Sequence, residues 1–115
     1  MQDFKPTPDG EPPIDPTLTI IITCYNTRDL VQDCLKSIYE NPPGEPYEIV
    51  LVDDASTDGT SEMVRASFPD VRLFRNDVNQ HYSYSNNRAL DNARGQFLLL
   101  LNNDTIVAPF ALASA

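Results

Sequence analysis

Small polar and acidic residues follow three of the four apolar segments that the sequence predicts as strands. They are Thr23-Cys24-Tyr25-Asn26 after the first segment, Asp53-Asp54 after the second and Asn102-Asn103-Asp104 after the fourth. Carboxylate and amide oxygens suit a hard divalent cation, which often shares its remaining positions with substrate phosphates. Asp104 is the candidate metal ligand, because it alone carries a formal charge among the three residues of its cluster.

Each acidic residue also has a purely structural interpretation. Asp104 and its two asparagines are common turn residues. Asp53 or Asp54 could cap the loop that follows, while Asp58 and Thr60 cap the next helix. Adjacent carboxylates repel each other unless a cation or a hydrogen-bond donor intervenes, and this cost favours a functional role for Asp53 and Asp54.

The segments between the clusters alternate between apolar runs and amphipathic stretches. Strands are expected at residues 18–23, 47–52, 71–74 and 96–101, and helices at about 26–40, 60–68 and 84–93. This alternation predicts an open, mainly parallel α/β sheet with right-handed crossovers and helices on both faces. Ligands bind such sheets beyond the carboxyl ends of the strands, so the polar clusters should meet at one edge.

Finer expectations concern burial and capping. Leu30, Cys34, Leu35 and Ile38 should share the buried face of the first helix, which Asn26 or Thr27 could cap. The four leucines at 98–101 predict a last strand that is not exposed.

Composition excludes several classes of protein. The chain has 115 residues, enough for one small domain, and its 8 basic and 17 acidic side chains give a net charge of −9. A basic nucleic-acid surface is therefore not expected. Two cysteines and one histidine provide neither a disulfide framework nor a zinc site. No long apolar run or leader is visible, so the expectation is a cytoplasmic chain that meets a membrane only through parts absent here.

Glycines and prolines narrow the interpretation further. The four glycines form neither a dinucleotide fingerprint nor a P-loop, and no nucleophile elbow is present. Residues 1–17 hold five of the ten prolines and are expected to be a tail or linker rather than a docking arm. The domain is expected over residues 18–115.

The polar clusters and their flanking residues resemble family 2 glycosyltransferases of the GT-A fold. The order and spacing of the blocks match the family over residues 18 to about 110. The matching blocks are TCYN at 23–26, VDDASTDGT at 52–60, NRAL at 87–90, ARG at 93–95 and LNNDT at 101–105. The resemblance implies a GT-A-like, Rossmann-like sheet that forms part of a larger domain.

Such enzymes move a sugar from a nucleotide diphosphate to an acceptor hydroxyl, with a divalent cation on the diphosphate. The resemblance implies Mn²⁺ or Mg²⁺ at Asp104. It also implies a nucleotide-binding set of Thr23, Tyr25, Asn26, Asp53, Asp54, Asn102 and Asn103. Within this set Thr23 and Asp54 would hold the nucleobase, which favours a UDP or dTDP sugar, and Asn102 and Asn103 would contact the ribose.

The segment before the third helix departs from the family pattern. Asn79-Gln80-His81 replaces Asn-x-Gly, and Asn86-Asn87 stands where Arg-Asn is usual, so Arg88 or His81 would have to supply the missing contact. The family's acceptor half and the catalytic base of its inverting members follow the metal motif, whereas this chain ends eleven residues after Asp104. The expectation is a donor-binding half with no catalytic residue of its own, whose edge at 104–115 exposes surface that the other half would cover.

Other classes remain as alternatives. A non-catalytic nucleotide-binding module would show the same clusters. A phospho-accepting receiver domain needs its acid pair after the first strand and a late lysine, but no lysine follows Lys36. A nucleotidyltransferase needs a glycine-rich basic loop after the first strand, which residues 23–28 lack.

Overall fold

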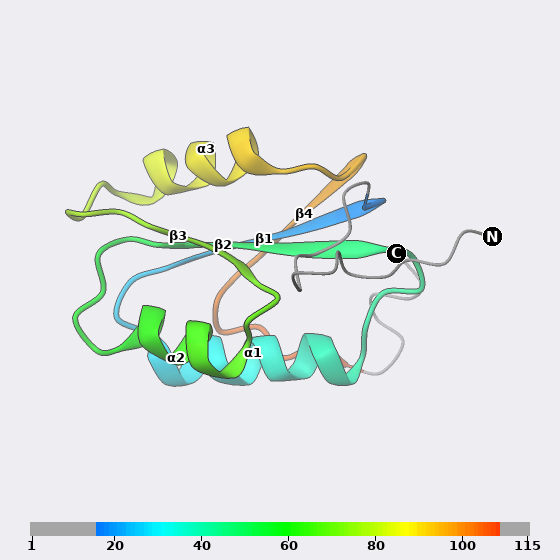
Figure 1. Ribbon diagram of the computed structural model, residues 1–115, viewed down its shortest axis with the longest axis horizontal. Coiled ribbons are helices and arrows are strands. Elements are labelled where there is room, and N and C mark those ends of the chain that lie inside the picture. Colours follow the sequence, from blue (N-terminus) through cyan, green and yellow to red (C-terminus); the bar gives the residue numbers. More distant parts are fainter. Residues whose placement is uncertain (1–15, 109–115) are drawn as a thin grey trace.

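Four parallel strands form one sheet in the computed structural model, which describes residues 16–108 (Figure 1). The strand order is β3-β2-β1-β4. The elements are β1 (Leu18–Cys24), α1 (Arg28–Glu40), β2 (Tyr47–Asp53), α2 (Thr60–Ser67), β3 (Arg72–Arg75), α3 (Tyr82–Asn92) and β4 (Phe97–Leu101). Helices α1 and α2 cover one face and α3 covers the other (Figure 1). The predicted α/β architecture is confirmed, while most of the expected tail at 1–17 lies outside the described residues.

Strand register explains why the polar clusters meet. β1 pairs with β2 from Leu18 opposite Tyr47 to Cys24 opposite Asp53. It also pairs with β4, ending at Ile22 opposite Leu101. The residues that follow these strand ends therefore leave the sheet at the same edge, on neighbouring strands.

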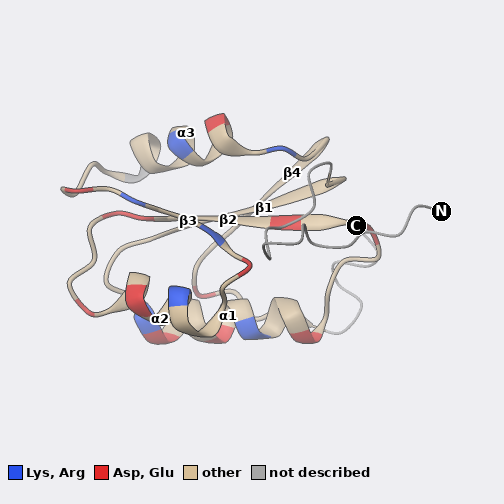
Figure 2. Ribbon diagram, viewed as in Figure 1, with Lys and Arg blue, Asp and Glu red and all other residues tan. Residues whose placement is uncertain are grey.

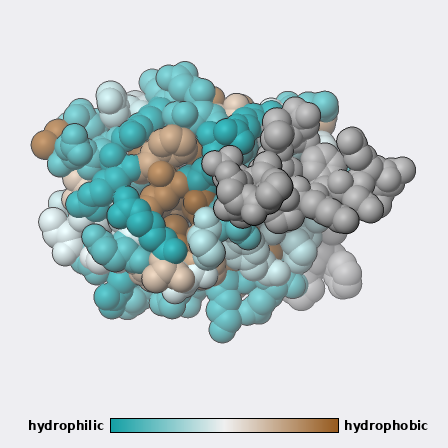
Figure 3. All heavy atoms as spheres, viewed as in Figure 1, coloured by the Kyte–Doolittle hydropathy of each residue, from teal (hydrophilic) through white to brown (hydrophobic). Residues whose placement is uncertain are grey.

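The two central strands carry the core. Ile20, Ile22 and Leu51 pack with α1 and α2, and the alternate residues Ile21 and Val50 pack on the side of α3. Because β1 and β2 are buried on both faces, their central runs at residues 20–22 and 49–52 are continuously apolar rather than alternating. In Figure 3, drawn with β3 in front, apolar atoms form a band between hydrophilic helix surfaces.

A buried carboxylate, Glu48, connects the C-terminal end of α3 to the sheet at the amino ends of its strands, away from the polar clusters. Glu48 is 2% exposed and accepts hydrogen bonds from Thr19 Oγ1 at 2.6 Å, Arg72 Nη1 at 2.8 Å and the Arg94 N–H at 2.6 Å. Arg72 also donates to the Asn92 carbonyl at 2.6 Å. These bonds fix α3 against β1, β2 and β3, and so help to set where its N-terminal turn lies.

Two expectations about burial are wrong. β4 is an edge strand that pairs only with β1 among the described strands, and Phe97, Leu98 and Leu100 are 64%, 46% and 50% exposed. In α1, Leu30 is 46% exposed and Val31 is buried in its place. The cause in each case is tertiary: β4 has a neighbour on one side only, and α1 is rotated so that Val31 faces the sheet.

The surface carries both signs of charge. Acidic segments are spread over α1, α2 and the loops, while the basic segments of β3 and α3 lie in adjacent layers (Figure 2). Within residues 16–108, no helix has the length and apolarity that a membrane crossing requires.

Candidate functional site

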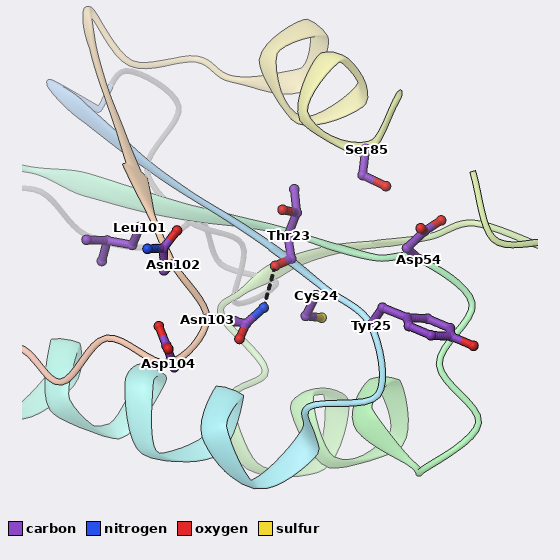
Figure 4. A pocket seen from close by; sticks show the side chains of 9 residues that line it. All are labelled: Thr23, Cys24, Tyr25, Asp54, Ser85, Leu101, Asn102, Asn103 and Asp104. Atoms are coloured by element: carbon purple, nitrogen blue, oxygen red, sulfur yellow. Dashed lines mark hydrogen bonds between the residues drawn. The ribbon is translucent and has the colours of Figure 1, made fainter. Parts of the chain in front are cut away.

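A cavity of about 390 Å³ opens at the carboxyl ends of β1, β2 and β4. All the predicted site residues except Asn26 and Asp53 line it (Figure 4). The lining residues are Thr23, Cys24, Tyr25, Asp54, Ser85, Leu101, Asn102, Asn103 and Asp104. Figure 4 shows Thr23 between Asp54 and the Asn102–Asp104 segment, with Asp54 toward α3 and Asp104 toward α1.

Asp54 is held at one end of the cavity by groups from the loop between β3 and α3. It is 6% exposed, and its N–H donates to the Cys24 carbonyl at 2.8 Å. Its Oδ1 accepts from Asn76 Nδ2 at 2.9 Å and from the Gln80 N–H at 2.7 Å. Among residues 16–108, its Oδ2 accepts only the His81 N–H, at 3.2 Å. Oδ2 is therefore the oxygen with capacity for a ligand N–H.

The other end of the cavity is formed by the segment after β4. Asn103 Nδ2 donates to the Thr23 carbonyl at 3.0 Å, which joins this segment to β1. Asp104 and Asn102 are exposed. Burial, followed by the negative charge of Asp104, raises the pKa of the Cys34 thiol on α1 to about 11. Figure 4 shows the Asp104 side chain next to α1, and Cys34 Sγ on that helix donates to the Asn102 carbonyl at 3.9 Å.

Cys24 lines the cavity but is not a nucleophile. Burial is the main cause that raises the pKa of its thiol, and the charges of Asp53, Asp58 and Asp54 raise it further. Its Sγ donates to the Val52 carbonyl at 3.7 Å. A neutral, bonded thiol contributes shape to the cavity rather than reactivity.

Asp53 has a structural role, because its carboxylate caps the loop that follows β2. Its side chain is fully buried; Oδ1 accepts the Ser56 N–H at 3.0 Å, and Oδ2 accepts from Ser61 Oγ at 2.5 Å and Arg75 Nη1 at 3.1 Å. These partners connect the loop after β2 to α2 and β3. A direct contact between Asp53 and a nucleotide stays a prediction.

Asn26 lies outside the cavity, in a surface hollow at the start of α1. Its φ is 52°, a left-handed conformation that asparagine tolerates. Its N–H donates to Ser56 Oγ at 2.8 Å and its Oδ1 accepts the Thr57 N–H at 2.8 Å. Its observed role is thus to join the loops after β1 and β2, and its place in nucleotide binding stays a prediction.

Asp58 accepts hydrogen bonds at the start of α2, as expected, and also at the start of α1, where Asn26 or Thr27 was the expected cap. Neither Asn26 nor Thr27 caps α1 through its side chain; instead Asp58 Oδ2 accepts the Arg28 N–H at 3.0 Å. Asp58 Oδ1 accepts the Thr60 N–H at the start of α2 at 3.1 Å. Desolvation alone would raise the pKa of Asp58, but hydrogen bonds from the Thr60 hydroxyl and from both N–H groups lower it.

Ser85 is the cavity residue that sequence reasoning missed. It is 1% exposed, and its Oγ accepts from Asn76 Nδ2 at 2.9 Å. Asn76 directly follows β3, and nothing in the local pattern indicates a partner nine residues later. Arg88, expected to replace an absent arginine, turns inward to the Arg75 carbonyl at 2.9 Å and to Asn76 Oδ1 at 2.7 Å.

The candidate metal donors of the Asn102–Asp104 segment are side-chain oxygen atoms. In the described range, no three His, Cys, Asp or Glu side chains gather into a metal cluster. Asp104 offers one carboxylate, beside the amide oxygens of Asn102 and Asn103. This set suits a hard cation that takes its other ligands from phosphates and water.

The chain matches a protein-family model and several known proteins in sequence. The model of the family described as "Glycosyl transferase family 2" matches residues 19–114. The uncharacterized glycosyltransferase YfnE of Bacillus subtilis is 32% identical over 92 residues, which cover 78% of this chain and 24% of that protein. Poly(ribitol-phosphate) beta-glucosyltransferase of Bacillus spizizenii is 31% identical over 100 residues, covering 83% and 16%.

Solved structures agree with the sequence relatives. The mannosyltransferase PcManGT from Pyrobaculum calidifontis, in complex with GDP-Man and Mn²⁺, has a TM-score of 0.77 and 31% identity over 97% of this chain and 34% of its own. S. aureus TarS 1-349 in complex with UDP-GlcNAc has a TM-score of 0.76 and 26% identity, over 85% and 29%. This chain spans between 16% and 34% of the length of these proteins. It belongs to glycosyltransferase family 2.

Proposed function

We propose that this chain forms the donor-binding part of an enzyme that transfers a sugar from a nucleotide-diphosphate sugar to an acceptor hydroxyl. One observation carries the proposal: a single cavity has Asp54 at one end and Asp104 at the other, with Thr23 between them (Figure 4). The Asp54 carboxylate can accept a hydrogen bond from a nucleobase, and the Asp104 carboxylate can hold the cation that a diphosphate requires. Similarity to proteins solved with GDP-Man and with UDP-GlcNAc supports the donor class.

The nucleobase is proposed to lie at Asp54. With Oδ1 occupied by two donors, Oδ2 is left to accept one N–H from a ligand. The imide of uracil or thymine provides one such N–H, with a carbonyl on either side. The Thr23 hydroxyl would serve one of these carbonyls, and Asn102 and Asn103 would contact the ribose. A UDP or dTDP sugar is therefore the proposed donor.

The divalent cation is proposed to lie at Asp104, with Mn²⁺ or Mg²⁺ as candidates. When bound, the cation would neutralise negative charge on the leaving diphosphate. Because the chain supplies one carboxylate there, metal and nucleotide should bind together rather than independently. The acceptor site and the catalytic base are proposed to belong to the part of the relatives that this chain does not span.

A thermal-shift panel tests the donor proposal. UDP, dTDP and GDP are each added with and without Mn²⁺, and the nucleotide that binds the folded state raises the Tm. We expect stabilisation by UDP or dTDP that requires Mn²⁺. Asp54→Asn should remove it, because an amide would present N–H to the imide N–H; a lost hydrogen bond to a charged group costs about 1.5–3 kcal/mol. Asp91→Asn, an exposed change on α3, is the matched control.

Calorimetry tests the cation site. Asp104→Asn should abolish the Mn²⁺ enhancement of UDP binding and leave the circular dichroism spectrum unchanged. An equal enhancement in this variant and in the parent chain would place the cation elsewhere.

The 115-residue chain should release no UDP from a UDP-sugar over many turnovers, because the acceptor site and the catalytic base are proposed to lie outside it. Metal-dependent turnover by this chain would contradict a role in donor binding alone.

A further inference from the structure

Three polar side chains lie behind the Asp54 end of the cavity. Asn76 and Ser85 are 3% and 1% exposed, and Arg88 is half-buried next to them. Of the three, only Ser85 lines the cavity. Buried polar groups of this kind stay paired, and the pairing fixes which atoms remain for a ligand.

The Asn76 amide is held in one orientation by charges on both sides. Its Nδ2 donates to Asp54 Oδ1 and to Ser85 Oγ, each at 2.9 Å, and its Oδ1 accepts from Arg88 Nη1 at 2.7 Å. A flipped amide would put N–H groups against the guanidinium and an oxygen against the carboxylate. Arg88 is itself fixed, because it donates to the Arg75 carbonyl and its guanidinium lies 5.5 Å from the Phe74 ring centroid.

The fixed Asn76 amide determines that the Ser85 hydroxyl oxygen acts as an acceptor toward Asn76. Its oxygen accepts the Asn76 N–H, and among the hydrogen bonds of the described residues it donates none. A serine hydroxyl has one hydrogen to donate, so this hydrogen is available to the cavity. Figure 4 shows the Ser85 hydroxyl on the side of the cavity where Asp54 lies.

We propose that Ser85 is a specificity-determining residue for the nucleobase, and that Asn76, held by Arg88, is the positioning residue that orients both Ser85 and Asp54. Thr23, Asp54 and Ser85 then present donor, acceptor and donor to the ligand. The imide edge of uracil or thymine presents the complementary carbonyl, N–H and carbonyl. Guanine presents one carbonyl followed by two adjacent N–H groups, which the Ser85 hydroxyl does not match. This inference rests on the proposed function.

The test is the ratio of the affinities for UDP and GDP, measured by calorimetry with Mn²⁺ on the full 115-residue chain. Loss of one neutral hydrogen bond weakens binding about 2- to 12-fold. Ser85→Ala should weaken UDP by this factor, leave GDP unchanged and so lower the ratio. Ser85→Thr keeps the hydroxyl and should restore the ratio. Ser83→Ala, an exposed change on the same helix, is the matched control and should change neither affinity.

Asn76→Ala tests the positioning role and should lower the UDP-to-GDP ratio at least as much as Ser85→Ala. If Asn76→Ala does not fold, Ser85→Ala decides the inference alone. A parent chain that binds UDP, loses it in Asp54→Asn and keeps its base ratio in Ser85→Ala overturns the inference but not the proposed function. A parent chain that binds neither nucleotide overturns both.

Discussion

Asp53 and Asp54 are adjacent, but their carboxylates enter different surroundings. Asp53 is the last residue of β2 and bonds to Ser61 on α2, whereas Asp54 bonds to the loop that leads to α3. Successive side chains of an extended chain point to opposite faces, which accounts for the division. The repulsion expected between neighbouring acids is offset because each carboxylate has its own set of donors.

Asp53→Ala should lower the free energy of unfolding by about 2–3 kcal/mol, because Arg75 loses its carboxylate partner and the Ser56 N–H loses its acceptor. The effect falls short of that of a fully buried pair, since the Arg75 side chain is 35% exposed. Urea denaturation measures it, with exposed Asp33→Ala as the control. A loss no larger than that of the control would show that Asp53 does not organise the loop.

The chain's two cysteines should be inert while it is folded. Burial is the main cause that raises the thiol pKa of both, to about 11 for Cys34, so little thiolate exists near neutral pH. A chromogenic disulfide reagent at pH 8 should detect no thiol in the native chain and two after denaturation. Rapid reaction of the native chain would mean that the packing around at least one of the two buried cysteines opens.

At the scale of elements, the sequence predicted what depends on local pattern. The β-branched runs of β1 and β2 and the polar residues after them were enough to place a site at one sheet edge. Ser85 could not be found in this way, because its distance from Asp54 depends on how α3 lies on the sheet. Leu30 and the β4 leucines were misjudged because burial depends on neighbours that periodicity does not reveal.

Asp58 connects two elements that no local rule would join, the starts of α1 and α2. Asp58→Ala should lower the free energy of unfolding by about 1–2 kcal/mol at neutral pH, since helix caps are lost. The folded-state pKa is lowered from 3.8, so this contribution is present above pH 3.8 and is lost as pH falls through the lower folded value. Urea denaturation of the variant and of the parent chain should therefore converge in acid. A constant difference would assign the effect to packing.

At the scale of the molecule, one end of the site directly follows β4, the strand that forms an exposed edge of the sheet. Asn102 to Asp104 continue from β4, whose outer edge has no partner among the described strands. The expectation of exposed surface at 104–115 is met for Ile106, which is 64% exposed, while residues 109–115 lie outside the described part. The chain spans 34% and 29% of the two solved structures compared above.

An open edge with apolar side chains on it promotes association between copies of a chain. Leu98 and Leu100 are 46% and 50% exposed and, two residues apart on β4, point to the same face. We expect the average mass of the 115-residue chain in sedimentation velocity to rise with concentration. Replacing both leucines by lysine should suppress the rise, because charge on an edge strand opposes pairing. Val78→Lys, a change of the same kind at a loop residue that is 59% exposed, should leave it unaltered. A parent chain that stays monomeric at every concentration would show that apolar exposure along β4 is insufficient for association.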